Sequence, residues 1–202
     1  MNRVCILDYG SGNVKSVKNA FAQSAPCIVS NDARDILNAS HLVLPGVGSY
    51  RNSMLRILET IPVDVVHQQA LNGKPLLGIC VGMQVLGENG IEFEEANGLG
   101  ILPGVVSKIN SGNFPLPHVG WNNLIDIEVS PITIGLTSED DFYFVHSYGF
   151  AEIPDEYVIA KASYGTSFPV IISSGNTYGV QFHPEKSQKA GRKLIENFLG
   201  IQ

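Results

Sequence analysis

The chain has 202 residues, of which 44% are hydrophobic and 16% are charged, and this balance excludes an intrinsically disordered protein. Its 13 basic and 19 acidic residues give a net charge of −6, which excludes a broad nucleic-acid-binding surface, because such surfaces are basic. The length fits one domain, and we expect residues 1–202 to form it.

The first hundred residues alternate between short apolar runs and segments with helical spacing. Strands are predicted at 4–7, 27–29, 41–44 and 75–79, and helices at 14–23, 32–37, 49–60, 62–71 and 81–87. Strands that alternate with helices indicate parallel βαβ units with right-handed crossovers.

Beyond residue 100 the pattern becomes rich in strands. They are predicted at 105–109, 124–129, 142–146, 157–163, 170–173 and 178–182, and an amphipathic helix at 188–199 closes the chain. The predicted fold class is therefore α/β, with a mixed, mostly parallel central sheet, helices on both of its faces and a smaller β-rich part.

Three glycine-rich turns, at 10–12, 46–48 and 78–82, follow predicted parallel strands, where ligands bind in such sheets. The third turn carries the sequence G-x-C-x-G between a strand and a helix, which is the nucleophile-elbow pattern with Cys80 as the nucleophile. Gly78 and Gly82 leave room for a sharp turn, the helix N-terminus favours a thiolate, and the Val81 amide can donate to an oxyanion. The alternative is a buried cysteine packed between two glycines.

A thiolate nucleophile needs a histidine, and the histidine needs an orienting group. His183 ends a predicted strand, Pro184 follows it, and Glu185 stands two residues on, within hydrogen-bonding reach of the imidazole. The alternative is a structural histidine at a strand end beside a solvated carboxylate.

The glycine-rich turn at 45–48 is the third element of this site. In a doubly wound sheet it lies beside the elbow, and its backbone can supply a second oxyanion donor from Val47 and Gly48. We interpret Gly46 as a residue that lets a peptide of this loop flip. An ordinary turn at the end of a strand is the alternative.

At this point the sequence resembles a known family. The motifs GICVGMQ at 78–84, FHPE at 182–185 and PGVG at 45–48 resemble the class I (triad) glutamine amidotransferases. The motifs DYGSGNVKSV at 8–17, PHVGWN at 117–122, YFVHSY at 143–148 and GVQFHPEKSQ at 179–188 are similar to the glutaminase subunits of imidazole glycerol phosphate synthases. This resemblance covers essentially the whole chain.

The resemblance implies a class I amidotransferase fold and a glutaminase reaction. Cys80 would attack the carboxamide of L-glutamine, His183 would shuttle protons, and Glu185 would orient His183. Glutamine would be held by three further residues: Gly48, Gln84 and Ser147.

The resemblance also implies a partner. Ammonia would pass to a separate HisF-type cyclase subunit in a heterodimer, with contact or gating residues at Asn13, Trp121, Asn122 and Lys186. Val119 and Leu116 depart from the usual form of the PHVGWN motif, which affects the expected interface but not the triad. No cofactor and no metal are expected.

Other assignments remain open at this stage. They are a paralogue that feeds ammonia to a HisF-like partner for amidino-sugar synthesis, a freestanding cysteine hydrolase, and a binding module with a vestigial site. Trp121 could also be a core residue rather than an interface anchor. The absence of a long apolar run or signal-like N-terminus predicts a cytoplasmic protein without membrane contact.

Overall fold

The computed structural model describes residues 3–10 and 13–202, so Gly12, in the first glycine-rich turn, lies outside the described residues. The helices are α1 (Val14–Phe21), α2 (Ala33–Asn38), α3 (Tyr50–Thr60), α4 (Val63–Leu71), α5 (Val81–Gln84) and α6 (Gln188–Leu199). The described residues also form 3₁₀ turns at Pro131–Thr133, Asp155–Tyr157 and Pro184–Lys186. No helix within these described residues is long and apolar enough to cross a membrane.

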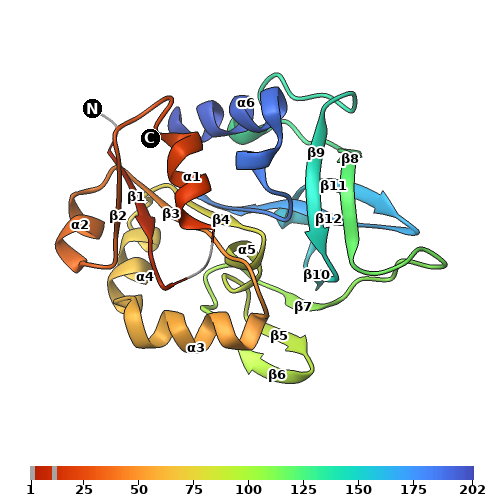
Figure 1. Ribbon diagram of the computed structural model, residues 1–202, viewed down its shortest axis with the longest axis horizontal. Helices are drawn as coiled ribbons and strands as arrows, with labels where there is room; N and C mark the ends of the chain where they lie inside the picture. The colour runs from red at the N-terminus through yellow and green to blue at the C-terminus, as the bar shows by residue number, and fades with distance from the viewer. Residues whose placement is uncertain (1–2, 11–12) are drawn as a thin grey trace.

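A seven-stranded mixed sheet forms the centre of the molecule (Figure 1). Its strands, in spatial order, are β11 (Val158–Tyr164), β12 (Thr166–Ser174), β13 (Thr177–Val180), β4 (Leu76–Ile79), β3 (His41–Leu44), β1 (Val4–Leu7) and β2 (Cys27–Ser30). The five strands from β13 to β2 run parallel, whereas β11 and β12 are antiparallel additions at one edge. The predicted α/β class is confirmed.

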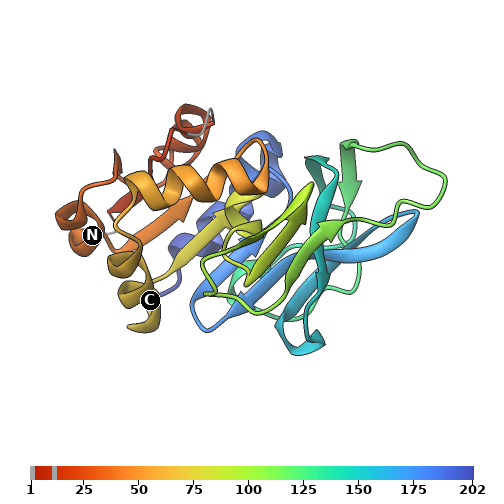
Figure 2. The ribbon, with the colours of Figure 1, turned by 90° about the horizontal axis from the view of Figure 1, so that it is seen from below.

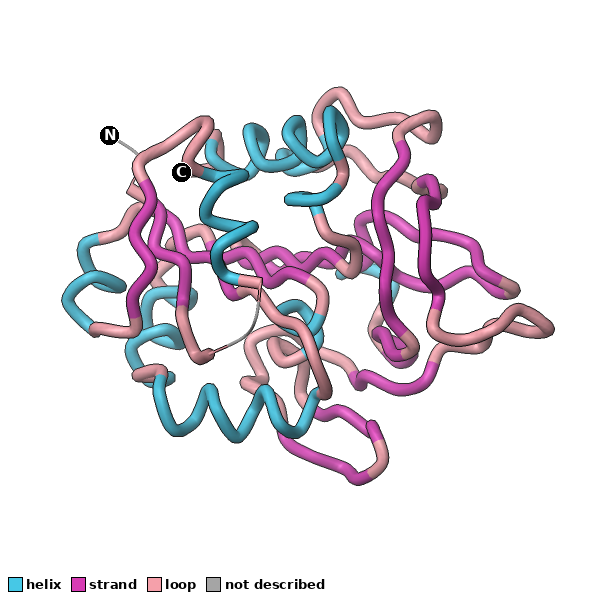
Figure 3. The backbone as a smooth tube through the Cα atoms, viewed as in Figure 1, coloured by secondary structure: helices cyan, strands magenta, loops and turns pink. Residues whose placement is uncertain are grey.

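Helices cover both faces of this sheet. In Figures 1 and 3, α1 and α6 lie on one face, and α3 and α4 lie on the other. Phe21 of α1 meets Phe198 of α6 edge to face, with ring centroids 6.3 Å apart, and both rings are buried. The strands β1, β3 and β4 are buried on both sides, as parallel strands between two helical layers are expected to be.

Two smaller sheets form the β-rich part, which lies to the right in Figure 2. The first has the order β10 (Tyr148–Glu152), β7 (Val105–Lys108), β5 (Asn89–Glu92) and β6 (Glu94–Asn97). The second is a ribbon of β8 (His118–Asn123) and β9 (Asp141–His146), which we call the β8–β9 ribbon.

The strand predicted at 124–129 is wrong. The strand occupies His118–Asn123 instead, and residues 124–129 contribute only the isolated bridge from Ile125 to Lys161. Asp126 adopts a φ of +50°, which an extended strand does not allow. Gly120, at a φ of +140°, interrupts the alternation that identifies a strand in a sequence.

The strands β3, β4 and β13 are neighbours in register, so their carboxyl ends meet at one edge of the sheet. The backbones of these segments approach each other closely there because glycines, which have no side chain, stand at the contact points. A Cβ atom on Gly82 would overlap the carbonyl oxygen of Leu44, and one on Gly78 would lie 2.7 Å from the Cα of Met83.

Gly82→Ala is therefore expected to lower the free energy of unfolding by about 3 kcal/mol or more, because the overlapping atoms belong to the backbone of β3. Gly200→Ala is the matched control, since Gly200 has a φ of −81° and its added Cβ would lie 3.3 Å from the nearest atom. Urea unfolding of both variants measures the difference, and equal stabilities would contradict the packing argument.

Candidate active site

Cys80 sits between β4 and α5 with a φ of 54° and a ψ of −114°, a conformation that non-glycine residues rarely adopt. Its amide donates to the carbonyl of Val180 at 2.8 Å, which ties the turn to β13. Cys80 is 3% exposed and lines a cavity of about 600 Å³. A strained, anchored residue facing a cavity is the nucleophile-elbow arrangement that G-x-C-x-G predicts.

The helix after Cys80 is shorter than predicted. It covers only Val81–Gln84 rather than 81–87, and the amides of Leu86 and Gly87 make i→i+3 hydrogen bonds instead of α-helical ones. Four residues align few peptide dipoles, so the helix dipole contributes less to a thiolate than the sequence pattern indicated. Val81 is the first residue of this helix, where amide N–H groups have no partner within the helix and can face a ligand.

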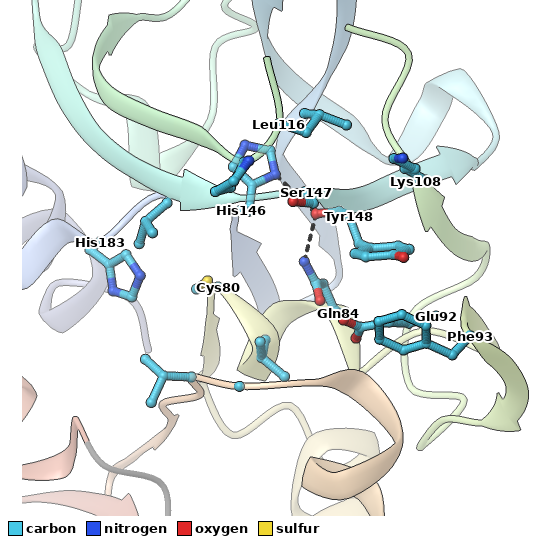
Figure 4. A pocket seen from close by; sticks show the side chains of 15 residues that line it. Cys80, Gln84, Glu92, Phe93, Lys108, Leu116, His146, Ser147, Tyr148 and His183 are labelled. Atoms are coloured by element: carbon cyan, nitrogen blue, oxygen red, sulfur yellow. Dashed lines mark hydrogen bonds between the residues drawn. The ribbon is translucent and has the colours of Figure 1, made fainter.

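His183 follows β13 and is completely buried. Its amide donates to the Tyr143 carbonyl at 2.9 Å, and its own carbonyl accepts from the Ser187 hydroxyl at 2.6 Å. These two bonds fix the backbone on both sides of the imidazole. In Figure 4 one nitrogen of the ring points towards Cys80.

Glu185 holds the other side of the imidazole, with His183 Nδ1 and Glu185 Oε1 2.7 Å apart and both side chains fully buried. Burial opposes the charge on His183, but hydrogen bonds and charges from Cys80 and Glu185 outweigh it and raise the pKa of His183 to about 9. Burial likewise opposes ionisation of Glu185, yet the pairing with His183 and the hydrogen bond from Asn13 lower its pKa. The structure thus brings together the three residues that the sequence singled out.

Asn13 is placed differently from the prediction. The sequence analysis gave it as a contact or gating residue towards the partner, but Asn13 is 9% exposed and its Nδ2 donates to Glu185 Oε1. The separation of 172 residues explains why no local pattern reveals this contact. Asn13 therefore supports the carboxylate that orients His183.

The loop after β3 approaches the elbow as predicted, and Val47, Gly48 and Val81 line the cavity with Cys80. The two glycines of this loop have different roles. A Cβ on Gly46 would overlap the amide of Gly82, so Gly46 is required by packing. The left-handed conformation is at Gly48, with a φ of +111°, so backbone freedom in this loop belongs to Gly48 rather than to Gly46.

Gln84 and Ser147 also line the cavity. Gln84 is 3% exposed, and its Nε2 donates to the Tyr148 carbonyl at 2.8 Å. Ser147 joins β9 to β10, and its carbonyl accepts from the Ile109 amide at 3.0 Å. Figure 4 shows Gln84 between Cys80 and the charged part of the cavity.

The sequence analysis missed two charged residues of the cavity, Glu92 and Lys108. Glu92 ends β5, and its Oε2 accepts from the Tyr50 amide at 2.6 Å, which directs the carboxylate to the cavity wall. The sequence signal for Glu92 was weak, because three of the four residues at 92–95 are acidic, a composition typical of a solvated turn.

The residues predicted to meet a partner lie on the β8–β9 ribbon and the turn beside it. Trp121 is 48% exposed and meets Tyr143 edge to face at 5.9 Å, so the alternative of a core tryptophan is wrong. Lys186 lies over the Tyr143 ring, with Nζ 5.5 Å from its centroid. Asn122 is half-buried, and its Nδ2 donates to the Ser163 carbonyl at 2.9 Å.

Comparisons with known proteins show the family to which the chain is similar. The family model described as glutamine amidotransferase class-I matches residues 5–201. The chain is 43% identical over 201 residues to the imidazole glycerol phosphate synthase subunit HisH of Lactococcus lactis, covering 98% of each chain. It is 42% identical over 195 residues to HisH of Streptococcus sanguinis, covering 96% of this chain and 93% of that protein.

Solved structures share the fold. A crystal structure of a glutamine amidotransferase matches with a TM-score of 0.77 at 21% identity, covering 98% of this chain and 97% of that chain. The structure of PurLQS from Thermotoga maritima matches with a TM-score of 0.75 at 23% identity, with the same coverage.

The buried ion pair makes a pH-dependent prediction. Because the pKa of His183 is raised from 6.5 to about 9, its contribution to stability is complete below pH 6.5 and is lost as the pH rises through 9. Because the pKa of Glu185 is lowered, its contribution is present above 4.5 and is lost on acidification. The two contributions overlap in the near-neutral range.

Glu185→Gln is therefore expected to lower the pKa of His183 from about 9 towards the ordinary histidine range, because burial then acts with less opposition. An NMR pH titration of the imidazole measures this shift. Glu59→Gln, on the exposed side of α3, is the control for loss of a carboxylate. An unchanged titration of His183 in the Glu185 variant would contradict the assignment.

Proposed function

The chain belongs to the class-I glutamine amidotransferase family, and on this premise we propose that it is the glutaminase subunit of an imidazole glycerol phosphate synthase in L-histidine biosynthesis. The observation that carries the proposal is the buried Cys80–His183–Glu185 arrangement at the floor of a cavity large enough for an amino acid. The chain is more than 40% identical to these HisH proteins along almost its whole length. This identity supports a role in histidine biosynthesis rather than that of a freestanding cysteine hydrolase.

The first half of the reaction follows from the positions of these groups. The Cys80 sulfur attacks the side-chain carboxamide carbon of glutamine, and a tetrahedral intermediate forms. The amide of Val81 and the backbone at Val47 and Gly48 stabilise its oxyanion. The imidazolium of His183 then donates a proton to the departing nitrogen, and ammonia leaves a γ-glutamyl thioester.

The second half regenerates the enzyme. His183, now neutral, accepts a proton from a water molecule that attacks the thioester carbonyl, and glutamate and the Cys80 thiolate are released. Glu185 keeps the imidazole in one orientation and stabilises its charged form in both halves. Asn13 holds the carboxylate of Glu185 in turn.

The cavity can recognise the amino-acid end of glutamine through its charges. Glu92 supplies an anion for the α-ammonium group, and Lys108 supplies a cation for the α-carboxylate. Gln84 and the backbone at Gly48 and Ser147 add uncharged contacts along the substrate.

A HisF-type cyclase subunit is the proposed recipient of the ammonia. It would use ammonia to form imidazole glycerol phosphate and the aminoimidazole-carboxamide ribotide AICAR. The exposed side of the β8–β9 ribbon supports a docking site, because the cross-strand pairs Val119–Val145 and Trp121–Tyr143 place four apolar or aromatic side chains together. Val145 also lines the cavity, so the docking face is continuous with the site that releases ammonia.

Cys80→Ala tests the chemistry. We expect a loss of glutamine-dependent synthesis by the complex of at least about a thousandfold, while synthesis from added ammonium salt stays at the wild-type rate. Cys27→Ala removes a half-buried cysteine elsewhere and should leave both rates unchanged. Failure of ammonium to restore synthesis would contradict the division of roles between the two subunits.

Trp121→Ala tests the docking face. Loss of an exposed aromatic anchor is expected to weaken binding of the HisF-type subunit by about tenfold or more, whereas the melting temperature changes by no more than about 2 °C. Leu58→Ala, which removes a 62% exposed side chain from α3, is the matched control. Calorimetric titration and thermal unfolding measure the two quantities, and a large stability loss with unchanged affinity would overturn the assignment.

A further inference from the structure

Gln181 is a completely buried polar residue that the reaction described above does not use. It stands between β13 and His183, and its Nε2 donates to the Cys80 sulfur at 3.7 Å. Its Oε1 accepts from Gln84 Nε2 at 3.0 Å. Gln181 thus connects the sulfur of the nucleophile with a residue that lines the glutamine cavity.

The orientation of both amide groups is determined by their partners. Gln84 Nε2 lies near two acceptors, the Tyr148 carbonyl and Gln181 Oε1, so the atom between them has to be the NH₂ group. The Gln181 atom that faces Gln84 is then the oxygen, and the atom that faces Cys80 is the NH₂ group. A reversed Gln181 amide would place two donors against each other and direct an oxygen at the sulfur.

The Tyr148 carbonyl is itself fixed by the two histidines of the β8–β9 ribbon. His146 Nδ1 donates to this carbonyl at 2.9 Å, and His146 Nε2 lies 3.2 Å from His118 Nδ1. Burial lowers the pKa of His146 to about 3, so the ring is neutral, with its proton on Nδ1 where the carbonyl accepts it. Nε2 is then the acceptor for His118, and the hydrogen bonds continue without conflict from β8 to Gln84.

We propose that Gln181 is a positioning residue for the nucleophile, whose side-chain N–H group holds the Cys80 sulfur and stabilises it as a thiolate, in an orientation imposed by Gln84. The inference rests on the proposed function, in which Cys80 is the nucleophile. An N–H donor strengthens its bond to sulfur when the sulfur becomes an anion, because charge-assisted hydrogen bonds are stronger than neutral ones. It therefore favours the reactive form of the cysteine.

The other titratable groups around Cys80 act from different directions. His183, paired with Glu185, approaches from the turn after β13, and His146 comes from the end of β9. Glu92 and Lys108 lie on the far side of Gln84 in Figure 4. Replacing Gln181 changes none of these charges, so a change in the reactivity of Cys80 can be attributed to the lost N–H group.

Gln181→Met removes the N–H group and keeps a chain of similar length that suits a buried site. The full-length chain is treated with iodoacetamide across a range of pH, and mass spectrometry measures alkylation of the Cys80 peptide apart from those of Cys5 and Cys27. We expect alkylation of Cys80 at pH 7 to slow by about tenfold, with the midpoint of its pH profile moved upward. Gln68→Met, on the exposed surface of α4, is the matched control and should behave as wild type.

Equal rates and midpoints in the Gln181 variant and the wild type would overturn the inference while leaving the proposed function intact. A wild-type Cys80 that reacts no faster than glutathione would instead contradict the proposed function. If the variant does not fold, NMR of the wild-type chain provides the test. The side-chain amide signals of Gln181 should shift as Cys80 ionises and should not do so in Cys80→Ala, and signals independent of pH in both proteins would overturn the inference.

Discussion

The close approach of three backbone segments at one edge of the central sheet is the constraint on which the site depends. The end of β3, the turn at Cys80 and the end of β13 meet where Gly46, Gly78 and Gly82 carry no side chains. This crowding holds Cys80 at a positive φ, a strained conformation that the surrounding backbone maintains. The same approach brings the loop backbone and Val81 to the cavity that Cys80 lines, so the predicted nucleophile and the proposed oxyanion donors face one space.

The buried ion pair depends on this scaffold. A carboxylate and an imidazolium lose much solvation when both side chains are fully buried, and their attraction offsets that loss only when geometry and additional hydrogen bonds are good. Here Asn13 donates to Glu185, and Ser187 and Tyr143 fix the backbone of His183. The charge of the pair is thus maintained by contacts from the residue before α1, from β9 and from the turn after β13, three segments that only the tertiary fold assembles.

Local sequence patterns were sufficient to predict much of the fold and the central residues of the candidate site. The motifs around Cys80 and His183 predicted a nucleophile and its base because each motif encodes its own backbone geometry, and the parallel order of β1, β3 and β4 follows from strands that alternate with helices. Long-range contacts were beyond such reasoning. Asn13 was predicted only as a contact or gating residue towards the partner, because nothing near it in the sequence indicates Glu185. Glu92 was missed because it ends the short strand β5, which lacks the apolar alternation that identifies strands, and is followed by the acidic strand β6.

The β8–β9 ribbon connects the outer surface with the site through its alternation of side chains. Phe142, Phe144 and His146 point inward from β9, whereas Tyr143 and Val145 point outward beside Trp121 and Val119. A partner that packs on the outer side contacts the same two strands whose inner side carries the His118–His146 pair. Since that pair fixes the Tyr148 carbonyl, and the carbonyl fixes Gln84, one set of hydrogen bonds connects the inner side of the ribbon with a residue that lines the Cys80 cavity.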